Sequence, residues 1–169
     1  VLDLACAIEV FQTAALVHDD IIDDSDLRRG KPAAHKALGT TSHSASLGRG
    51  LGIMLGDLLA TASVDIAHAA AQRMPRPDMI VSTFLRMHRE VEIGQVLDLA
   101  AEEETPDAEH IYTLQDLKTG ALIRAACCCG VVAGHGSAAQ YEAAARYATA
   151  LGLAFQIRDD MLDVLGDAK

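Results

Sequence analysis

The sequence has few aromatic residues and few basic ones. Phe, Tyr and Trp together make up 4% of the 169 residues, and Trp is absent, which disfavours sheets built from aromatic and β-branched side chains. Lys and Arg number 14 against 24 Asp and Glu, giving a formal net charge of −10. Because no basic stripe with interleaved aromatics occurs, nucleic acid is not an expected partner. An acidic protein of this kind needs bridging cations to bind an anion.

Long apolar runs and separated cysteines are also missing. No apolar run reaches the roughly 18 residues of a spanning helix, and the first residues show no signal-peptide pattern. We therefore expect a soluble, cytoplasmic protein without a transmembrane segment. Cys127, Cys128 and Cys129 are adjacent and Cys6 stands alone, which fits neither a zinc site nor a disulfide framework. We interpret the cysteines as small packing residues in a reducing compartment.

Apolar residues are abundant, at 50% of the chain, and their spacing predicts helices throughout. The expected helices cover residues 2–22, 51–74, 79–101, a stretch containing 114–134, and 137–166. Asp78 and Ser137 are the expected N-caps of two of them. Helices of this length joined by short loops predict an all-α bundle. The sequence begins inside an amphipathic helical pattern and stops at "DVLGDAK" without a closing element, so we expect part of a larger domain.

The first group of candidate site residues is an acidic cluster at the end of the first helix. Asp19, Asp20 and Asp23 form a DDxxD pattern, and residues four apart on a helix share one face. Carboxylates at that spacing repel each other unless a cation lies between them, and Mg²⁺ prefers such oxygen ligands. The alternative is an acidic helix end that is simply solvated.

A second DDxxD pattern occurs more than 130 residues later, where "FQIRDDMLD" contains Asp159, Asp160 and Asp163. It also follows an apolar helical stretch. Acid on the inward side of an apolar helix costs several kcal/mol unless it is paired or metal-bound. Two such helices facing across a bundle core would form a cage for several Mg²⁺ ions.

Basic residues complete the pattern. Arg28 and Arg29 follow the first acidic cluster, and Lys118 with Thr119 lies in an apolar helical stretch. Guanidinium and ammonium groups are the natural partners of phosphate oxygens. Metal ions and basic residues around one cavity predict a diphosphate ligand, and walls of Leu, Ala and Ile predict that the rest of this ligand is hydrocarbon.

Five segments together resemble the ordered motifs of the trans-polyprenyl diphosphate synthases, the family of farnesyl and geranylgeranyl diphosphate synthases. They are "LVHDDIIDDSDLRRGKPAAHK", "GDLL", "GQVLDL", "LKTGAL" and "GLAFQIRDDMLD". They occur in the family's order, from about Leu4 to Asp167. The resemblance implies an isoprenoid-synthase-type helix bundle around a central cavity. It also implies that residues 1–169 are the central portion of the family domain, with its N- and C-terminal parts absent.

The resemblance assigns roles to individual residues. It implies that Asp19, Asp23 and Asp159 bind Mg²⁺, supported by Asp20, Asp160 and Asp163, with about three ions per active site. The implied ligands of the allylic diphosphate are Arg28, Lys118, Thr119 and Gln156. Arg29 would bind isopentenyl diphosphate, and Gln95 and Asp98 would lie at the cavity wall near the metals. For these last two, ordinary polar helix positions remain the alternative.

The implied reaction condenses isopentenyl diphosphate with an allylic prenyl diphosphate, in a homodimer, to give a longer trans-prenyl diphosphate. In this family the growing tail lies beside the helix before the first acidic motif, so bulky residues there limit its length. Ala14 and Ala15 are small and Phe11 is the first bulky group. This favours a product of about C20, with C15 or longer as alternatives.

Other interpretations remain open. A class I terpene cyclase would also ionise a prenyl diphosphate, but it would have a different second metal motif and aromatic walls. A non-catalytic or truncated partner subunit of a prenyl synthase is the other alternative. "GLGIMLG", at 50–56, superficially resembles a dinucleotide-binding loop, but no strand precedes it and close helix packing is the expected role. His18 is expected to pack or to form hydrogen bonds.

Overall fold

The computed structural model describes residues 1–101 and 107–165, without the side chains of residues 163 and 164. The described chain is almost wholly helical, which confirms the all-α prediction. It divides into two compact units, an N-terminal unit of residues 2–70 and a C-terminal unit that begins at Ala71. The expectation that residues 1–169 form one partial domain stays a prediction.

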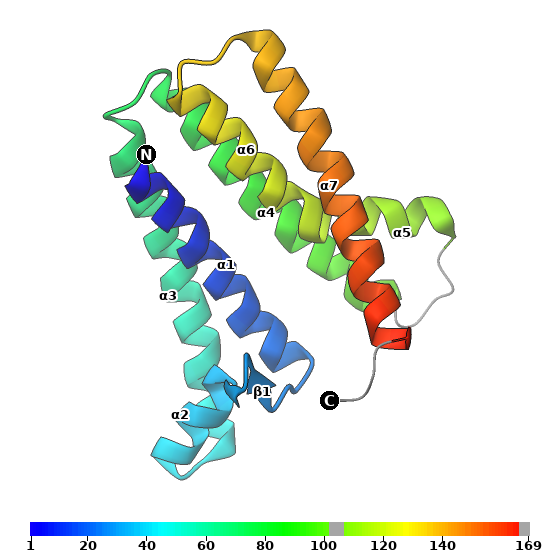
Figure 1. Cartoon of the computed structure of the whole chain (residues 1–169). Helices are drawn as coiled ribbons and strands as arrows, with labels where there is room; N and C mark the ends of the chain where they lie inside the picture. The colour runs from blue at the N-terminus through cyan, green and yellow to red at the C-terminus, as the bar shows by residue number, and fades with distance from the viewer. Residues whose placement is uncertain (102–106, 166–169) are drawn as a thin grey trace. The chain divides into compact units, whose positions relative to one another are not determined.

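The N-terminal unit contains α1 (Leu2–Ile22), a hairpin of β1 (Leu27–Arg28) and β2 (Lys31–Pro32), α2 (Ala34–Ser42) and α3 (Ala45–Ala71) (Figure 1). Helix α1 has the bounds that its periodicity predicts. Its buried apolar residues recur at steps of three and four and form one stripe: Leu4, Ala7, Phe11, Ala14, Val17 and Ile21. This stripe ends at the acidic cluster.

Helix α3 begins at Ala45, so the predicted start near Leu51 is wrong. The predicted polar, glycine-rich lead-in is helical because its glycines let neighbouring helices approach. Gly48, Gly52 and Gly56 lie four residues apart on one face of the helix. A Cβ would meet Gly39 of α2 at Gly48, Ile21 of α1 at Gly52, and His18 of α1 at Gly56. Segment 50–56 is thus helical and not a dinucleotide loop, and its Gly52 and Gly56 permit close helix packing, as expected.

Segment 34–42, which lies outside the expected helices, forms α2. The strands before it pair in antiparallel register, Leu27 with Pro32 and Arg28 with Lys31. Arg29 and Gly30 connect them, both with positive φ, at 53° and 75°. Two residues with positive φ are what a tight hairpin with the right-handed strand twist requires. The backbone therefore reverses directly after Arg28.

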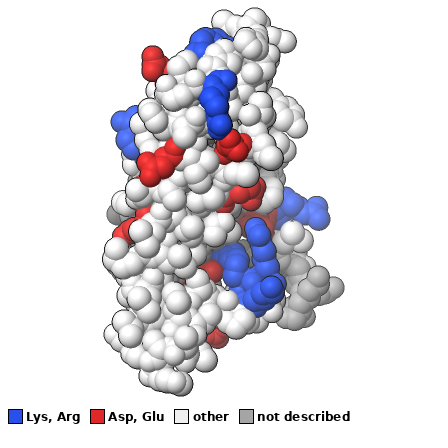
Figure 2. Space-filling model, turned by 90° about the vertical axis from the view of Figure 1, so that its left-hand side faces the viewer, with Lys and Arg blue, Asp and Glu red and all other residues white. Residues whose placement is uncertain are grey.

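By length and composition alone, α3 is the one described helix that could cross a membrane, with 22% of its apolar window buried. The core helix of a soluble protein meets the same criteria. Figure 2 views the side of Figure 1 on which α3 lies, and it shows wide uncharged areas beside places where acidic and basic side chains gather. The expected absence of a transmembrane segment stays a prediction.

The C-terminal unit contains α4 (Pro77–Ala101), α5 (Ala108–Gln115), a π-helical turn η1 (Asp116–Gly120), α6 (Ala121–Ala133) and α7 (Ala138–Leu165). Helix α6 packs against both α4 and α7. The single helix predicted around residues 114–134 is therefore wrong in one respect, because a π-turn divides α5 from α6. Such turns insert a residue into the helical ladder and are frequent at functional sites.

Two helix starts were predicted from capping residues. Ser137 caps α7 as expected: its Oγ accepts from Gln140 N at 3.3 Å, and its own N–H donates to Gln140 Oε1 at 2.8 Å. Asp78 is not the N-cap of α4, because the helix begins one residue earlier, at Pro77. Proline is preorganised for the first helical position, where its missing N–H costs nothing.

The cysteines behave partly as predicted. Cys128 and Cys129 are buried on α6, Cys127 is half-buried and Cys6 is exposed. Burial raises the pKa of Cys129 to about 12. Its thiol is consequently a packing group and not a nucleophile.

Candidate active site

In the N-terminal unit the acidic cluster occupies the last turn of α1, and its most buried member is Asp20. Asp20 is 2% exposed, and its Oδ1 accepts hydrogen bonds from Arg28 Nε at 2.9 Å and Nη2 at 2.5 Å. This contact with Asp20 raises the pKa of Arg28. The chain turns between Ile22 and Leu27, where Ser25 N–H donates to the Asp20 carbonyl at 2.9 Å, and the Arg28 guanidinium thereby meets the helix that precedes it.

Asp19 and Asp23 lie beside this pair. Arg28 Nη2 is 3.6 Å from Asp19 Oδ2, and the Asp19 side chain is 22% exposed. Asp23, one turn further along, is exposed. His18 instead serves packing, as expected: its Nε2 is 3.1 Å from the Ile53 carbonyl oxygen of α3, and its ring lies against Gly56. The accessible carboxylates of this cluster are therefore those of Asp19 and Asp23.

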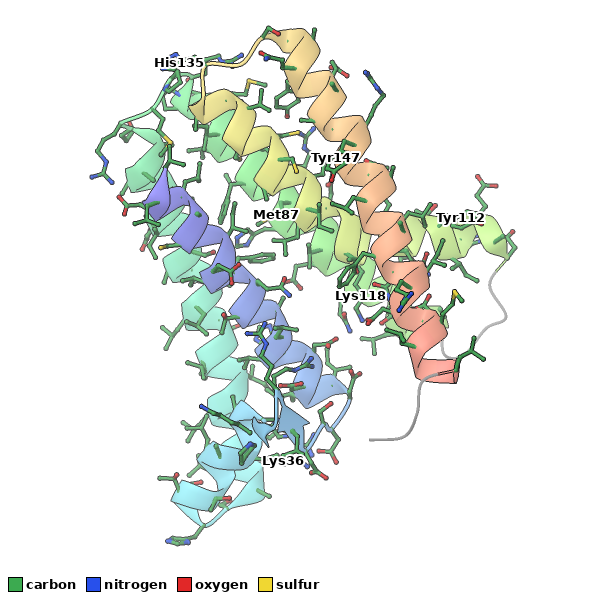
Figure 3. All side chains as sticks on the ribbon, in the orientation of Figure 1. Lys36, Met87, Tyr112, Lys118, His135 and Tyr147 are labelled. Atoms are coloured by element: carbon green, nitrogen blue, oxygen red, sulfur yellow. The ribbon has the colours of Figure 1, made fainter. Side chains whose placement is uncertain are left out.

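A cluster around Asp24 closes the end of α1, and sequence reasoning missed it. Asp24 Oδ1 accepts from Lys36 Nζ and from Arg49 Nη2, both at 3.0 Å, and Arg49 also donates to the Ile21 carbonyl. The hydrogen bond from Lys36, with the nearby Arg49, lowers the pKa of Asp24. The partners are 12 and 25 residues from Asp24, so no local pattern could have revealed them. Figure 3 labels Lys36 near the hairpin.

The residues proposed to limit the length of the prenyl product lie nearer the N-terminal end of α1 than the acidic cluster does. Phe11 and Ala14 are each 1% exposed, and Ala15 is half-buried. All three belong to the stretch of α1 before the acidic cluster. Their role in limiting product length stays a prediction.

In the C-terminal unit the π-turn η1 carries Lys118, which is labelled in Figure 3, and Thr119, and these two residues contact two different helices. Lys118 Nζ donates to Asp98 Oδ2 of α4 at 2.5 Å, and Thr119 Oγ1 donates to Gln156 Oε1 of α7 at 2.7 Å. Four residues predicted for the site thus form two hydrogen-bonded pairs whose donors are adjacent in the chain. Gln95 is half-buried on α4, one helical turn from Asp98.

The hydrogen bonds continue from Gln156 to the second acidic motif. Gln156 Nε2 donates to Asp160 Oδ1 at 2.8 Å, and Gln115 Nε2 donates to Asp160 Oδ2 at 2.7 Å. Asp159, the preceding residue, is exposed. Asp163 belongs to α7, but its side chain lies outside the described residues. Gln115 was not predicted from the sequence.

Two glycines allow the π-turn to approach its neighbours. A Cβ at Gly94 of α4 would lie 2.6 Å from the Cα of Lys118, and a Cβ at Gly152 of α7 would lie 2.7 Å from the Cα of Gly120. Real Cβ atoms do not approach backbone so closely, so glycine at these two positions permits the packing.

Arg124 connects the π-turn to α4 and α7 through hydrogen bonds, and it was not predicted from the sequence. It donates to Asp116 Oδ1 at 2.6 Å, to Glu90 Oε2 at 2.9 Å and to Thr149 Oγ1 at 3.2 Å. These partners come from the π-turn, α4 and α7. A lone arginine within the apolar stretch "ALIRAACCC" was the available signal, because a charge there must find partners.

The carboxylates provide hard oxygen donors, which suit Mg²⁺. Among the described residues, no three His, Cys, Asp or Glu side chains are grouped so that they could hold a metal ion. Mg²⁺ does not need such a group, since proteins commonly bind it through one or two carboxylates, waters and substrate phosphates. Asp19 with Asp23 in one unit, and Asp159 in the other, fit that requirement.

The structure therefore brings the predicted residues together within each unit. Asp19, Asp20, Asp23 and Arg28 gather at the end of α1, while Asp98, Lys118, Thr119, Gln156 and Asp160 gather around the π-turn. The two acidic motifs belong to different units. Their expected arrangement across a central cavity stays a prediction.

Known proteins resemble the whole chain. The polyprenyl synthetase family model matches residues 1–169. Geranylgeranyl pyrophosphate synthase 3, chloroplastic, of Arabidopsis thaliana is 34% identical over 95% of this chain and 45% of its own length. A short chain isoprenyl diphosphate synthase of Methanocaldococcus jannaschii is 34% identical over 100% of this chain and 49% of its own length.

Solved structures agree. A geranylgeranyl pyrophosphate synthase from Corynebacterium glutamicum, complexed with isoprenyl diphosphate and magnesium, matches with a TM-score of 0.90 and 31% identity. The match covers 98% of this chain and 49% of that one. The chain spans about half the length of the curated relatives it matches. Since the family model matches from the first residue to the last and the site motifs lie within it, the chain belongs to the polyprenyl synthetase family.

Proposed function

We propose that the full-length protein is a Mg²⁺-dependent prenyltransferase that condenses isopentenyl diphosphate with an allylic prenyl diphosphate. The observation that carries the proposal is the π-turn, which places Lys118 beside Asp98 and Thr119 beside Gln156. The names of the relatives, geranylgeranyl pyrophosphate synthase and short chain isoprenyl diphosphate synthase, support the reaction class.

The basic residues would hold the diphosphates while keeping their present partners. An ammonium group has three N–H donors, so Lys118 can donate to Asp98 and to a phosphate oxygen at once. A guanidinium has five, and Arg28 directs two of them at Asp20. We assign Arg28, Lys118, Thr119 and Gln156 to the allylic diphosphate and Arg29 to isopentenyl diphosphate. Gln95 and Asp98 would line the wall beside them.

The acidic residues would hold the metal. We assign Mg²⁺ binding to Asp19, Asp23 and Asp159, with Asp20, Asp160 and Asp163 in support, and about three ions per site. When bound, Mg²⁺ supplies positive charge that stabilises the departing diphosphate. Asp20 is bonded to Arg28 and Asp160 to two amides. These two carboxylates would therefore orient their neighbours more than they would ligate directly.

The reaction needs no protein nucleophile. The allylic C–O bond breaks and its electron pair leaves with the diphosphate, which Lys118 and Arg28 help to stabilise. The double bond of isopentenyl diphosphate then forms the new C–C bond to the allylic cation. Loss of a proton from the adjacent carbon to the released diphosphate restores a double bond. The products are one longer prenyl diphosphate and one diphosphate.

A product of about C20 is our proposal for chain length, with Phe11 as the floor. The buried position of Phe11 and Ala14 on the apolar stripe of α1 is consistent with it. Geranylgeranyl synthases among the relatives also support it. We further propose a homodimer, as the family resemblance implies, and a cytoplasmic location, as the lack of a signal-peptide pattern and of a long apolar run in the sequence suggested.

Labelled isopentenyl diphosphate, supplied to the full-length protein with allylic primers and Mg²⁺, tests the proposal. Chain-elongated product is expected from the wild type. Asp19→Asn and Asp159→Asn should each lower the rate by at least about 100-fold with helicity unchanged, whereas Asp65→Asn, an exposed site on α3, should not. Cyclic hydrocarbon would indicate a terpene cyclase instead. Absence of any product would favour a non-catalytic partner subunit.

A further inference from the structure

Gln115 is a buried polar residue next to the candidate site. It is the last residue of α5, directly before the π-turn, and it is 6% exposed. Its Nε2 donates to Asp160 Oδ2 at 2.7 Å. Among the described residues its Oε1 is buried and accepts no hydrogen bond. A buried amide that is only half satisfied costs folding free energy compared with an apolar side chain of the same size.

The hydrogen bond from Gln115 completes a clamp on Asp160. The other carboxylate oxygen, Oδ1, accepts from Gln156 Nε2 at 2.8 Å, and Gln156 Oε1 in turn accepts from Thr119 Oγ1 at 2.7 Å. Each oxygen of Asp160 thus has its own amide donor, one from α5 and one from α7. With two donors on separate elements, the carboxylate plane has a single favoured orientation.

The two amides that donate to Asp160 are uncharged, and this distinguishes Asp160 from the other acidic residues around the π-turn. Asp98 is paired with the Lys118 ammonium, and Asp116 with the Arg124 guanidinium. Amides orient a carboxylate without adding a compensating positive charge. The two amide contacts therefore hold the direction of the Asp160 carboxylate without placing a cation beside it.

We propose that Gln115 is a positioning residue that orients Asp160, and through it the second acidic motif, toward Mg²⁺ and diphosphate. This rests on the function proposed above. Gln115 directly precedes the turn that carries Lys118 and Thr119, and its hydrogen bond connects this turn to the acidic motif. The end of α7 that would bind cations and the turn that would bind phosphate are thereby held in a fixed position relative to each other. Partners of this kind tune metal affinity although they do not touch the metal.

Gln115→Met in the full-length protein is the central test. Methionine has the length and flexibility of glutamine but no amide donor, so packing is retained. The variant should unfold at the same temperature as the wild type or higher. Calorimetric titration should show that Mg²⁺-dependent binding of inorganic diphosphate is weakened about 10-fold. Gln115→Glu, which sets a second carboxylate against Asp160, should weaken it further.

A double-mutant cycle with Asp160→Asn isolates the contact. If Gln115 acts through Asp160, Gln115→Met should have little additional effect in the Asp160→Asn background. An equal effect in both backgrounds would overturn the proposal. So would wild-type affinity in Gln115→Met, or a loss of stability that accounts for its weaker binding, because Gln115 would then be a structural residue only.

The binding measurement separates this inference from the proposed reaction. If the wild type binds Mg²⁺ and diphosphate but forms no elongated product, the proposed reaction is wrong. The role of Gln115 can then still be tested by comparing the diphosphate affinity of the wild type with that of Gln115→Met. If the wild type elongates and Gln115→Met keeps the same Mg²⁺ dependence, only the inference about Gln115 fails. Absence of Mg²⁺-dependent diphosphate binding by the wild type would overturn both.

Discussion

Gly94 of α4 lies against the backbone of Lys118, so close that a Cβ at position 94 would stand 2.6 Å from the Lys118 Cα. The same lysine reaches back to Asp98, one turn further along α4. One helix thus carries both the surface on which the π-turn rests and the carboxylate that its lysine contacts. A glycine within the motif "GQVLDL" consequently has a packing role that its neighbours in sequence do not reveal.

Gly94→Ala should displace the π-turn. The added methyl group cannot avoid the backbone of Leu117 and Lys118, so we expect a loss of about 1–3 kcal/mol in the free energy of unfolding. Prenyl transfer should fall with it, because Lys118 and Thr119 move together. Urea denaturation and the rate with labelled isopentenyl diphosphate measure the two effects.

Gly130→Ala is the matched control. Gly130 is an exposed glycine within α6, and a Cβ there would meet nothing within 4 Å. Alanine should be neutral or stabilise the helix by about 0.5–1 kcal/mol through its higher helix propensity. Equal stabilities for both alanine variants would contradict the packing role of Gly94.

We expect Arg28 to contribute both to stability and to substrate binding, and Arg29 to contribute to substrate binding alone. Removing Arg28 leaves the buried carboxylate of Asp20 without its partner, which should cost about 2 kcal/mol of stability. Arg29 is exposed in the hairpin turn, and its removal should change stability by less than about 0.5 kcal/mol. Arg28→Ala and Arg29→Ala should both weaken substrate binding, but thermal unfolding should distinguish them. Similar unfolding temperatures would argue against the Asp20 contact.

His88 should make the protein less stable in mild acid. Burial lowers the pKa of His88 from its usual 6.5 to about 4. Between those values the unfolded chain takes up a proton that the folded chain does not, so stability falls as the pH falls from 6.5 to 4. Since His88 is only half-buried, we expect about 1–2 kcal/mol from this group.

Denaturation curves at several values of pH test this prediction. His88→Gln should flatten the loss of stability between pH 6.5 and 4. His68→Gln, at an exposed position on α3, should leave it unchanged. A wild-type slope in the His88 variant would show that other groups cause the acid sensitivity.

Phe11→Leu should lengthen the product. Phe11 is 1% exposed, and the smaller side chain would remove part of the proposed floor at a cost of about 1 kcal/mol in stability. Chromatography of the hydrolysed products should show chains longer than those of the wild type. Phe84→Leu makes the same change at a buried site on α4 and should not alter the distribution. An unchanged product length in the Phe11 variant would remove Phe11 as the floor.

Local patterns accounted for much of the fold. The three- and four-residue spacing of apolar positions predicted α1 with its observed bounds, and Ser137 with Gln140 caps α7. The start of α3 was missed because a glycine-rich segment has low helix propensity. Packing against α1 and α2 overrides that low propensity. The spacing of residues in the sequence does not show that glycine lets these helices pack closely.

The sequence by itself determined the residue types and their placement on helices: two DDxxD patterns, the arginines behind the first, and Lys118 with Thr119. These follow from spacing within one or two helical turns. Only the tertiary structure decided which charges meet, because those contacts join residues distant in the chain. Asp20 pairs with Arg28 across the turn between α1 and β1, Asp98 with Lys118 across a helix contact, and Asp160 with Gln115 from 45 residues away. The pairings around the π-turn depend on how close two backbones can come, and glycines at 94 and 152 permit that approach.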